Sequence, residues 1–327
     1  MLIGYLVLLI ISAIILYICC EKLVKILIKI SSFLGVREFV LAFFVMALAS
    51  AFPNLFLGIN SAINGVPDLS FGDVLGNNLV ALTLAVALGV LFSKNKVIPT
   101  ESRTVQNTCI FTFIAALLPL LLAMDGRISR GDALILILAF ALYVFWLFSK
   151  QERFRKVFQE SHFKEPLQII IEFKSFIRSI LQILGILIIL FIASQFIIFS
   201  ARAISNQLNV SLILIGLLMT GLINALPEIY FSINSARKGE TWMVLGNLMG
   251  SVIFPATLVI GLIALIHPIT ISDFSSMALA RFFLILALVF FFLFSQTDRK
   301  LSKKEALFLL FLYLIYIFVE ILKHANT

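Results

Sequence analysis

Charged residues are scarce in this chain of 327 residues: they make up 13% of it, and hydrophobic residues make up 61%. No stretch is polar enough to fold as a separate soluble domain. Apolar runs long enough to cross a hydrocarbon layer of ~30 Å recur along the whole chain. The sequence therefore predicts a multi-pass membrane protein. We interpret its formal net charge of +8 as a mark of membrane orientation, not of nucleic-acid binding.

Cysteine and histidine are also rare, with three residues of each. The cysteines show neither metal-binding spacing nor a paired disulfide framework. The histidines fall in expected loops or near the chain end, and no His/Glu pair has the helical spacing of a metalloenzyme. These features argue against an intramembrane enzyme, so we expect neither catalytic activity nor a resident cofactor.

Ten apolar segments are long enough to be membrane-spanning helices. They cover residues 2–20, 38–64, 69–93, 107–124, 131–149, 179–201, 210–236, 242–266, 277–296 and 305–322. No Lys or Arg precedes the first, so we interpret it as a span and not as a cleaved signal peptide. With the N-terminus outside, 20 of the 25 Lys and Arg residues fall in inner loops. This excess predicts a cell-membrane protein with both termini extracytoplasmic.

The chain contains a second copy of one of its own segments. Shifting residues 30–80 by 174 positions aligns them with residues 204–254, and 14 of the 51 pairs are identical. Pro53 aligns with Pro227, and four pairs of glycines or asparagines also coincide. Paired Gly/Pro-interrupted spans in two halves of a membrane protein indicate the substrate site of a transporter.

Ten spans divide into two groups of five, and an odd number of spans turns the second group upside down relative to the first. The predicted fold is therefore all-α, with two inverted five-helix repeats. We expect a first repeat at 1–149, a cytoplasmic linker at 150–178 and a second repeat at 179–327. The duplicated cores lie at about 38–93 and 210–266.

Two acidic residues are predicted to lie inside the membrane, where carboxylates are costly and mark functional sites. Glu228 is in the seventh span and Asp73 is early in the third. Each aligns with an amide in the other copy: Asn54 corresponds to Glu228, and Asn247 corresponds to Asp73. Folding the two copies together should gather these four side chains. A third acid, Glu320 near the end of the last span, is expected to reach the membrane surface.

Further oxygen-bearing side chains lie on the same two faces, one helical turn before or two turns after the residue that follows each proline. They are Ser50, Asn224, Ser61 and Ser235. The two prolines should break their helices and free backbone carbonyls nearby. Oxygen ligands suit hard cations, of which Ca²⁺ takes roughly six to eight. Two carboxylates can be balanced by one divalent or two monovalent cations, which is what an exchanger requires.

The duplicated motifs resemble the two alpha-repeats of the cation/calcium exchanger superfamily, which includes the sodium/calcium exchangers. The second copy carries Asn224-Ala225-Leu226-Pro227-Glu228, then Gly239-Glu240, then Gly246-Asn247-Leu248-Met249-Gly250-Ser251; the first carries Ser50-Ala51-Phe52-Pro53-Asn54 and Gly72-Asp73-Val74-Leu75-Gly76-Asn77-Asn78. In that family the residue after each proline is normally a cation-binding Glu. Asn54 stands where the first of these is expected.

The resemblance implies a secondary-active antiporter that exchanges calcium for sodium or protons by alternating access. Glu228 would be the primary cation ligand, Asp73 the second charge, and Asn54 and Asn247 neutral ligands. The expected partners are the transported cations and the lipid bilayer. Two alternatives stay open: an antiporter for another cation pair (sodium/proton, potassium or manganese), and a regulatory membrane protein that keeps the exchanger fold without transporting.

Overall fold

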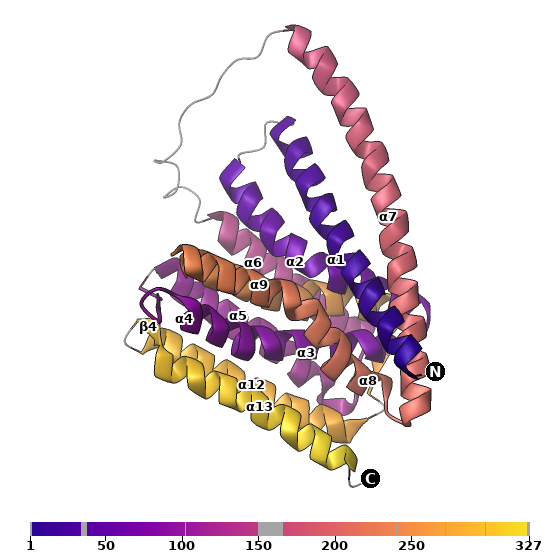
Figure 1. Ribbon diagram of the computed structural model, residues 1–327, viewed down its shortest axis with the longest axis vertical. Helices are drawn as coiled ribbons and strands as arrows, with labels where there is room; N and C mark the ends of the chain where they lie inside the picture. Colours follow the sequence, from indigo (N-terminus) through magenta and orange to yellow (C-terminus); the bar gives the residue numbers. More distant parts are fainter. Residues whose placement is uncertain are drawn as a thin grey trace.

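The structure, a computed structural model, describes residues 2–33, 38–101, 103–149, 166–239, 241–271, 273–297 and 299–325. Within these ranges the protein is almost entirely helical, with four short strands that pair two by two. Figure 1 shows the helices gathered in a bundle, with one end of α7 extending beyond it. Both chain ends lie at the right of this view, and β4 lies at the opposite end of the bundle.

The first half begins with two long helices and continues through helices joined by short turns and strands. In order they are α1 (Leu2–Phe33), α2 (Glu38–Ile63), α3 (Pro67–Val80), the π-helical turn η1 (Ala81–Ala85), α4 (Val86–Phe92), β1 (Val97–Pro99), α5 (Arg103–Leu122), the 3₁₀ turn η2 (Ala123–Asp125), β2 (Arg127–Ile128) and α6 (Arg130–Ser149). Because η1 joins α3 to α4 directly, residues 67–92 form one helical stretch.

The second half has a similar order of elements. They are α7 (Pro166–Leu208), α8 (Leu212–Ile215), the π-helical turn η4 (Gly216–Thr220), α9 (Gly221–Lys238), α10 (Thr241–Phe254), the π-helical turn η5 (Pro255–Val259), α11 (Ile260–Ile266), β3 (Ile269–Thr270), α12 (Phe274–Gln296), β4 (Lys300–Ser302) and α13 (Lys303–Ala325). The turns η1 and η5 begin at Ala81 and Pro255, so they are separated by the same 174 positions as the sequence repeat.

Nine helical stretches among the described residues are long and apolar enough to cross a membrane. They correspond to nine of the predicted spans. The remaining predicted span, 38–64, coincides with the 26-residue helix α2, of which Ala51–Ile63 is classed as a shorter apolar helix. The prediction of an all-helical, multi-pass membrane protein is confirmed.

Two helices are longer than predicted. The span predicted at 2–20 continues to Phe33 in α1, and the span predicted at 179–201 lies within α7, which runs from Pro166 to Leu208. Lysine and arginine end an apolar run but favour helix, so a helix can continue past its membrane-spanning part. The predicted linker at 150–178 therefore includes the start of α7, and its residues 150–165 lie outside the described part of the chain.

The prediction that the prolines break their helices is wrong. α2 continues through Pro53, and α9 continues through Pro227. A proline removes one hydrogen bond to the preceding turn, and the turns on either side keep the helix intact. In the described part of the chain, the irregular helical backbone lies instead in the π-helical turns η1, η4 and η5, of which η4 directly precedes α9.

Two small antiparallel sheets each join a loop of the first half to a loop of the second. β1 pairs with β4, with Val97 opposite Ser302. β2 pairs with β3, with Arg127 opposite Thr270. In the repeat alignment, adding 174 to the residue numbers of β1 gives numbers next to those of β3, and subtracting 174 from those of β4 gives numbers that include those of β2. The two sheets therefore correspond to each other in the alignment of the two halves.

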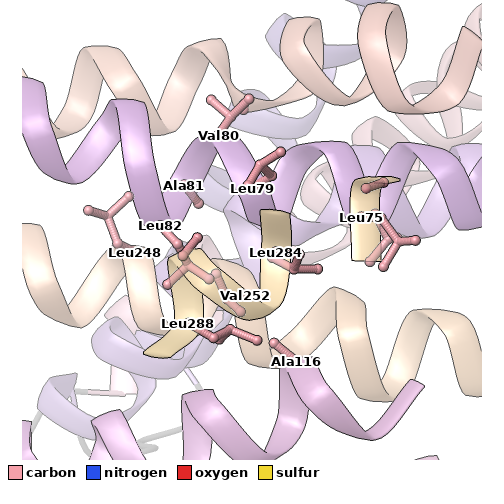
Figure 2. Close-up of a cluster of buried hydrophobic side chains, with 14 of the residues drawn as sticks. Leu75, Leu79, Val80, Ala81, Leu82, Ala116, Leu248, Val252, Leu284 and Leu288 are labelled. Atoms are coloured by element: carbon pink, nitrogen blue, oxygen red, sulfur yellow. The ribbon is translucent and has the colours of Figure 1, made fainter. Parts of the chain in front are cut away.

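The main hydrophobic core lies where α3, η1, α5, α10 and α12 meet. Figure 2 shows Leu75, Leu82, Ala116, Leu248 and Leu288 in this cluster, contributed by those five elements. A second core forms mainly between α1 and α7 and includes residues of α2 and α3. Among the described residues, α1 and α7 contact each other more extensively than any other two elements, and Figure 1 shows them side by side. They form a helix pair packed against the rest of the bundle.

Glycines allow α3 to cross α8 and η4 at backbone distance. A Cβ added to Gly72 would lie 2.2 Å from the carbonyl oxygen of Ile213, and one added to Gly76 would lie 2.2 Å from that of Leu217. From the other side, a Cβ on Gly216 would lie 2.2 Å from the carbonyl oxygen of Leu69. No other residue fits at these positions without separating the helices. This crossing brings Asp73 next to the helix that carries Glu228.

Candidate cation-binding site

The four predicted central residues are buried on four helices that pack together. Asn54 on α2 and Glu228 on α9 are each 1% exposed, Asp73 on α3 is 0% exposed, and Asn247 on α10 is 8% exposed. α2 contacts both α3 and α10, and α9 contacts the same two helices. The helices of the two duplicated segments therefore pack together, and each buries one of these four side chains.

The amide of Asn224 joins the two segments directly. Its Nδ2 donates a hydrogen bond to Oδ1 of Asn54 at 3.1 Å and another to Oδ1 of Asp73 at 2.8 Å. The side chain of Thr220, in η4, is also within interaction range of the Asp73 carboxylate. Asn224 thus holds the oxygens of α2 and α3 against α9, across the interface between the two copies.

The two carboxylates are close enough to influence each other electrostatically. Glu228 lies one helical turn after Asn224, on the same face of α9. Both of its carboxylate oxygens, and Oδ2 of Asp73, are buried without a hydrogen-bond partner among the described residues. A buried carboxylate without a partner is strongly unfavourable, so these oxygens require a cation or a proton to accompany them.

The four outlying residues predicted by helical spacing have different surroundings. Asn224 is central, as described above. The hydroxyl of Ser61 lies 2.6 Å from that of Ser70 and donates to the carbonyl of Gly58 at 3.0 Å, so local groups already satisfy it. Ser235 is buried near the end of α9. Ser50 belongs to α2, but its side chain lies outside the described part of the structure.

Two asparagines on α3 were missed as candidate ligands. Asn77 and Asn78 are 0% exposed, and in the described part of the chain none of their side-chain nitrogen or oxygen atoms has a hydrogen-bond partner. Asn77 lies one turn after Asp73, so the helical spacing that indicated Asn224 and Ser50 also indicates Asn77. These two amides extend the set of unpaired buried polar groups along α3.

The π-helical turns were also not predicted. Each contains a threonine whose hydroxyl donates to the carbonyl four residues earlier: Thr83 to Leu79, Thr220 to Gly216, and Thr257 to Ile253. Threonine commonly makes this bond within helices, and π-turns often lie at functional sites. Thr83 and Thr257 are 174 positions apart, so the repeat alignment pairs them although it does not reveal the turn.

The expectation that Glu320 reaches the membrane surface is wrong. Its side chain is 0% exposed, because α13 packs against α12 there. Its Oε1 lies 3.5 Å from Nζ of Lys323, which also donates to the hydroxyl of Ser276 at 3.0 Å. Lys323 is the partly exposed member of the pair. Glu320 is therefore a buried structural acid that forms an ion pair, away from the cluster on α2, α3 and α9.

Comparison with known proteins identifies the family. The family model for sodium/calcium exchanger protein matches residues 4–149 and 178–322, which is most of the chain. The chain belongs to the sodium/calcium exchanger family. It is 22% identical over 320 residues to the sodium/calcium exchanger MaX1 of Methanosarcina acetivorans, covering 88% of this chain and 89% of that one. It is 23% identical over 255 residues to the inner membrane protein YrbG of Escherichia coli, covering 78% and 77%.

Solved structures of two exchangers share the fold. The sodium-calcium exchanger NCX_Mj aligns with a TM-score of 0.62 at 21% identity, covering 97% of this chain and 99% of that one. The H⁺/Ca²⁺ exchanger CAX aligns with a TM-score of 0.74 at 16% identity, covering 96% of this chain and 82% of that one. The exchanger-type fold inferred from the sequence is therefore confirmed.

Proposed function

We propose that this member of the sodium/calcium exchanger family is a secondary-active antiporter that exchanges calcium for sodium or protons. The observation that carries the proposal is the pair of buried carboxylates, Asp73 and Glu228, with three oxygens left without partners. No basic side chain among the described residues forms an ion pair with either. The names of the relatives, which include a sodium/calcium exchanger and an H⁺/Ca²⁺ exchanger, support the same substrate class.

The charge of the site explains how one kind of bound cation can replace another. Two carboxylates carry two negative charges, which one calcium ion, two sodium ions or two protons would neutralise equally. The neutral oxygens of Asn54 and Asn247 would complete the coordination of a hard cation, which prefers oxygen ligands. If the buried site changed its access from one side of the membrane to the other without a bound cation or proton, its negative charges would stay uncompensated. This requirement favours exchange over leak.

We further propose that the fold consists of ten spans in two inverted five-helix repeats, at 1–149 and 179–327. The two sheets support this arrangement, because each pairs one strand from each half. An even number of spans returns the chain to its starting side, which agrees with the two chain ends lying at one end of the bundle (Figure 1). The excess of Lys and Arg in the predicted cytoplasmic loops favours an extracytoplasmic location for that end.

The helix pair α1 and α7 is the part of the fold best suited to move during alternating access. These helices share a core that is largely separate from the main one, and they pack against α2, which carries Asn54. Sliding or rocking of this pair against the remaining helices would open the site to one side of the membrane at a time.

Reconstitution into liposomes tests the proposed exchange. Purified protein should take up radiolabelled calcium when an outward sodium gradient or an outward proton gradient is imposed, and the two gradients applied separately identify the driving ion. Glu228→Gln keeps the size of the side chain and removes one charge, so it should abolish exchange while the protein still folds. A fully active variant would show that Glu228 is not a ligand.

Asn54 makes a second candidate function testable. An amide stands where the family normally has a glutamate, and Asn224 occupies its oxygen, which favours either another cation pair or a non-transporting regulatory protein. Parallel flux measurements with sodium, potassium and manganese distinguish the first of these. No gradient-driven uptake of any cation would support the regulatory role. Asn54→Glu should strengthen divalent binding, and unchanged affinity would mean that Asn54 does not line the site.

A further inference from the structure

Basic side chains from three distant chain segments converge around the β1–β4 sheet. All of them are exposed. They are Lys94, Lys96, Arg237, Lys238, Arg299, Lys300, Lys303 and Lys304. We propose that this basic surface binds the headgroups of anionic phospholipids. The proposal concerns a surface at one end of the bundle and does not depend on which cations the protein exchanges.

Specific contacts bring the three segments together. The strand register places Pro99 opposite Lys300, and the N–H of Thr100 donates to the carbonyl of Arg299 at 2.8 Å. The end of α9 reaches the same place, because the guanidinium of Arg237 lies over the ring of Phe92 with its Cζ 4.7 Å from the ring centroid. The basic surface is therefore a fixed part of the tertiary structure and not a run of charges on one loop.

Two of these basic residues occupy a backbone conformation that favours glycine. Lys96, just before β1, has φ of 52°, and Arg299, just before β4, has φ of 51°. Positive φ is unfavourable for a residue with a Cβ, and such strained residues concentrate at functional positions. Before β2, in the equivalent sheet, the corresponding turn uses Gly126 with φ of 87°. Lysine and arginine thus occupy two turn positions whose backbone conformation glycine would adopt with less strain.

The β2–β3 sheet provides the contrast. Its Arg127 lies 3.8 Å from the carboxylate of Asp125, and Nε of Arg130 donates to the carbonyl of Leu265. Around the β1–β4 sheet, the carboxylate of Glu305 accepts hydrogen bonds from Ser302 at the start of α13, and Glu101 is exposed. Asp298 and Glu240 lie outside the described residues. Among the described residues here, the eight basic residues outnumber the two acids Glu101 and Glu305. The excess of positive charge around the β1–β4 sheet is therefore not a feature that the fold imposes on both sheets.

Anionic phospholipid is the occupant that best matches this surface. The surface lies at the ends of membrane-spanning stretches, where headgroup phosphates are found, and each nearby basic residue strengthens attachment to an anionic leaflet about fivefold. Phe92, which is 42% exposed beneath Arg237, offers an apolar contact for the upper part of an acyl chain. Arginine and lysine beside an aromatic side chain are typical of the membrane interface.

Lipid binding to the full-length protein in neutral detergent tests the proposal. Native mass spectrometry would be used to titrate phosphatidylglycerol against phosphatidylcholine. We expect clear preference for phosphatidylglycerol. The double variant Lys96→Gly/Arg299→Gly should weaken its binding about 25-fold, since two charges are lost. Its melting temperature should stay the same or rise, because glycine relieves the backbone strain. Loss of lipid preference in a stable protein cannot be attributed to unfolding.

The matched control removes two charges from the other sheet. Arg127→Gln/Arg130→Gln should leave phosphatidylglycerol binding within about twofold of the wild type, because charges at the opposite end of the bundle do not act on this surface. Three results would overturn the proposal: equal binding of the two lipids by the wild type, an equal loss in the control variant, or displacement of the lipid by an equal concentration of inorganic phosphate, which would indicate a site for free anions.

Discussion

The glycine crossing between α3 and η4 predicts a large and local effect of a single methyl group. In Gly76→Ala the new Cβ would lie 2.2 Å from the carbonyl oxygen of Leu217 and 3.0 Å from its Cα. Carbon and oxygen atoms normally approach to about 3.3 Å, so the helices must separate by about 1 Å. Neither neighbour is a flexible side chain that could turn away.

The expected cost follows from this overlap. Overpacking a well-packed core costs about 1–3 kcal/mol, and we expect the upper end here because both clashing groups are backbone. For a protein of this size that corresponds to a fall in melting temperature of about 4 °C. Separation of α3 from η4 should also draw Asp73 away from Asn224, so exchange activity should fall at temperatures where the variant remains folded.

Gly185→Ala is the matched control, since it makes the same substitution within a helix. A Cβ at Gly185 in α7 would meet no atom within 4 Å, so the change should be neutral or stabilising by about 0.5–1 kcal/mol. Thermal unfolding of both variants in the same detergent, followed by size-exclusion chromatography, gives the comparison. If Gly76→Ala unfolded within about 1 °C of wild type, the close crossing would be wrong.

Two further predictions concern charged residues outside the candidate cation-binding site. Burial would raise the pKa of Asp273, but hydrogen bonds from Ser276 and Ser211 and the charge of Lys323 outweigh it and lower this pKa below its ordinary 3.8. The ionised form of Asp273 therefore stabilises the folded state above about pH 4, and this contribution is lost as the pH falls through the lowered pKa. Asp273→Asn should reduce the melting temperature at pH 7, and the difference from the wild type should disappear on acidification below about pH 4. Glu320→Gln leaves Lys323 without its counter-charge and should destabilise the protein by roughly 1–3 kcal/mol, less than for a fully buried pair because Lys323 is partly exposed. The exposed Glu101→Gln is its control, and equal melting temperatures for the two variants would contradict the burial of Glu320.

Hydropathy predicted the helices because the bilayer demands long apolar segments. The 174-residue repeat aligned Asn54 with Glu228 and Asp73 with Asn247. The helix ends were less predictable. Beyond position 20, Lys22, Lys25 and Lys29 interrupt the apolar run of α1 but favour helix, so the expected span ends before the helix does. Pro53 shows the opposite difficulty, because a proline that looks like a break costs one hydrogen bond and is accommodated within α2.

Tertiary packing decided what the sequence could not. Glu320 resembles a surface residue because a lysine follows three positions later, and only the packing of α12 against α13 buries it. Asn224 was predicted as a lining oxygen, whereas its nitrogen is the atom that contacts Asn54 and Asp73. Which end of an amide faces a neighbour depends on the groups across the interface, and these come from two helices far away in the sequence.

The distribution of charge within the site distinguishes this protein from one with two equivalent halves. Each pair of repeat-related positions contains one acid and one amide: Asn54 with Glu228, and Asp73 with Asn247. The proposed cation site would therefore carry two negative charges, and exchanging the halves would move both of them. In an inverted-repeat exchanger the inward-open and outward-open states are related by such an exchange. The two states would then offer a cation the same number of ligands, with the negative charges at different positions. The inward-open and outward-open states should therefore differ in their affinity for the same cation. Asn54→Glu/Glu228→Asn would move one charge to its repeat-related position at constant total charge, and it should shift the ratio of the two affinities without removing divalent binding.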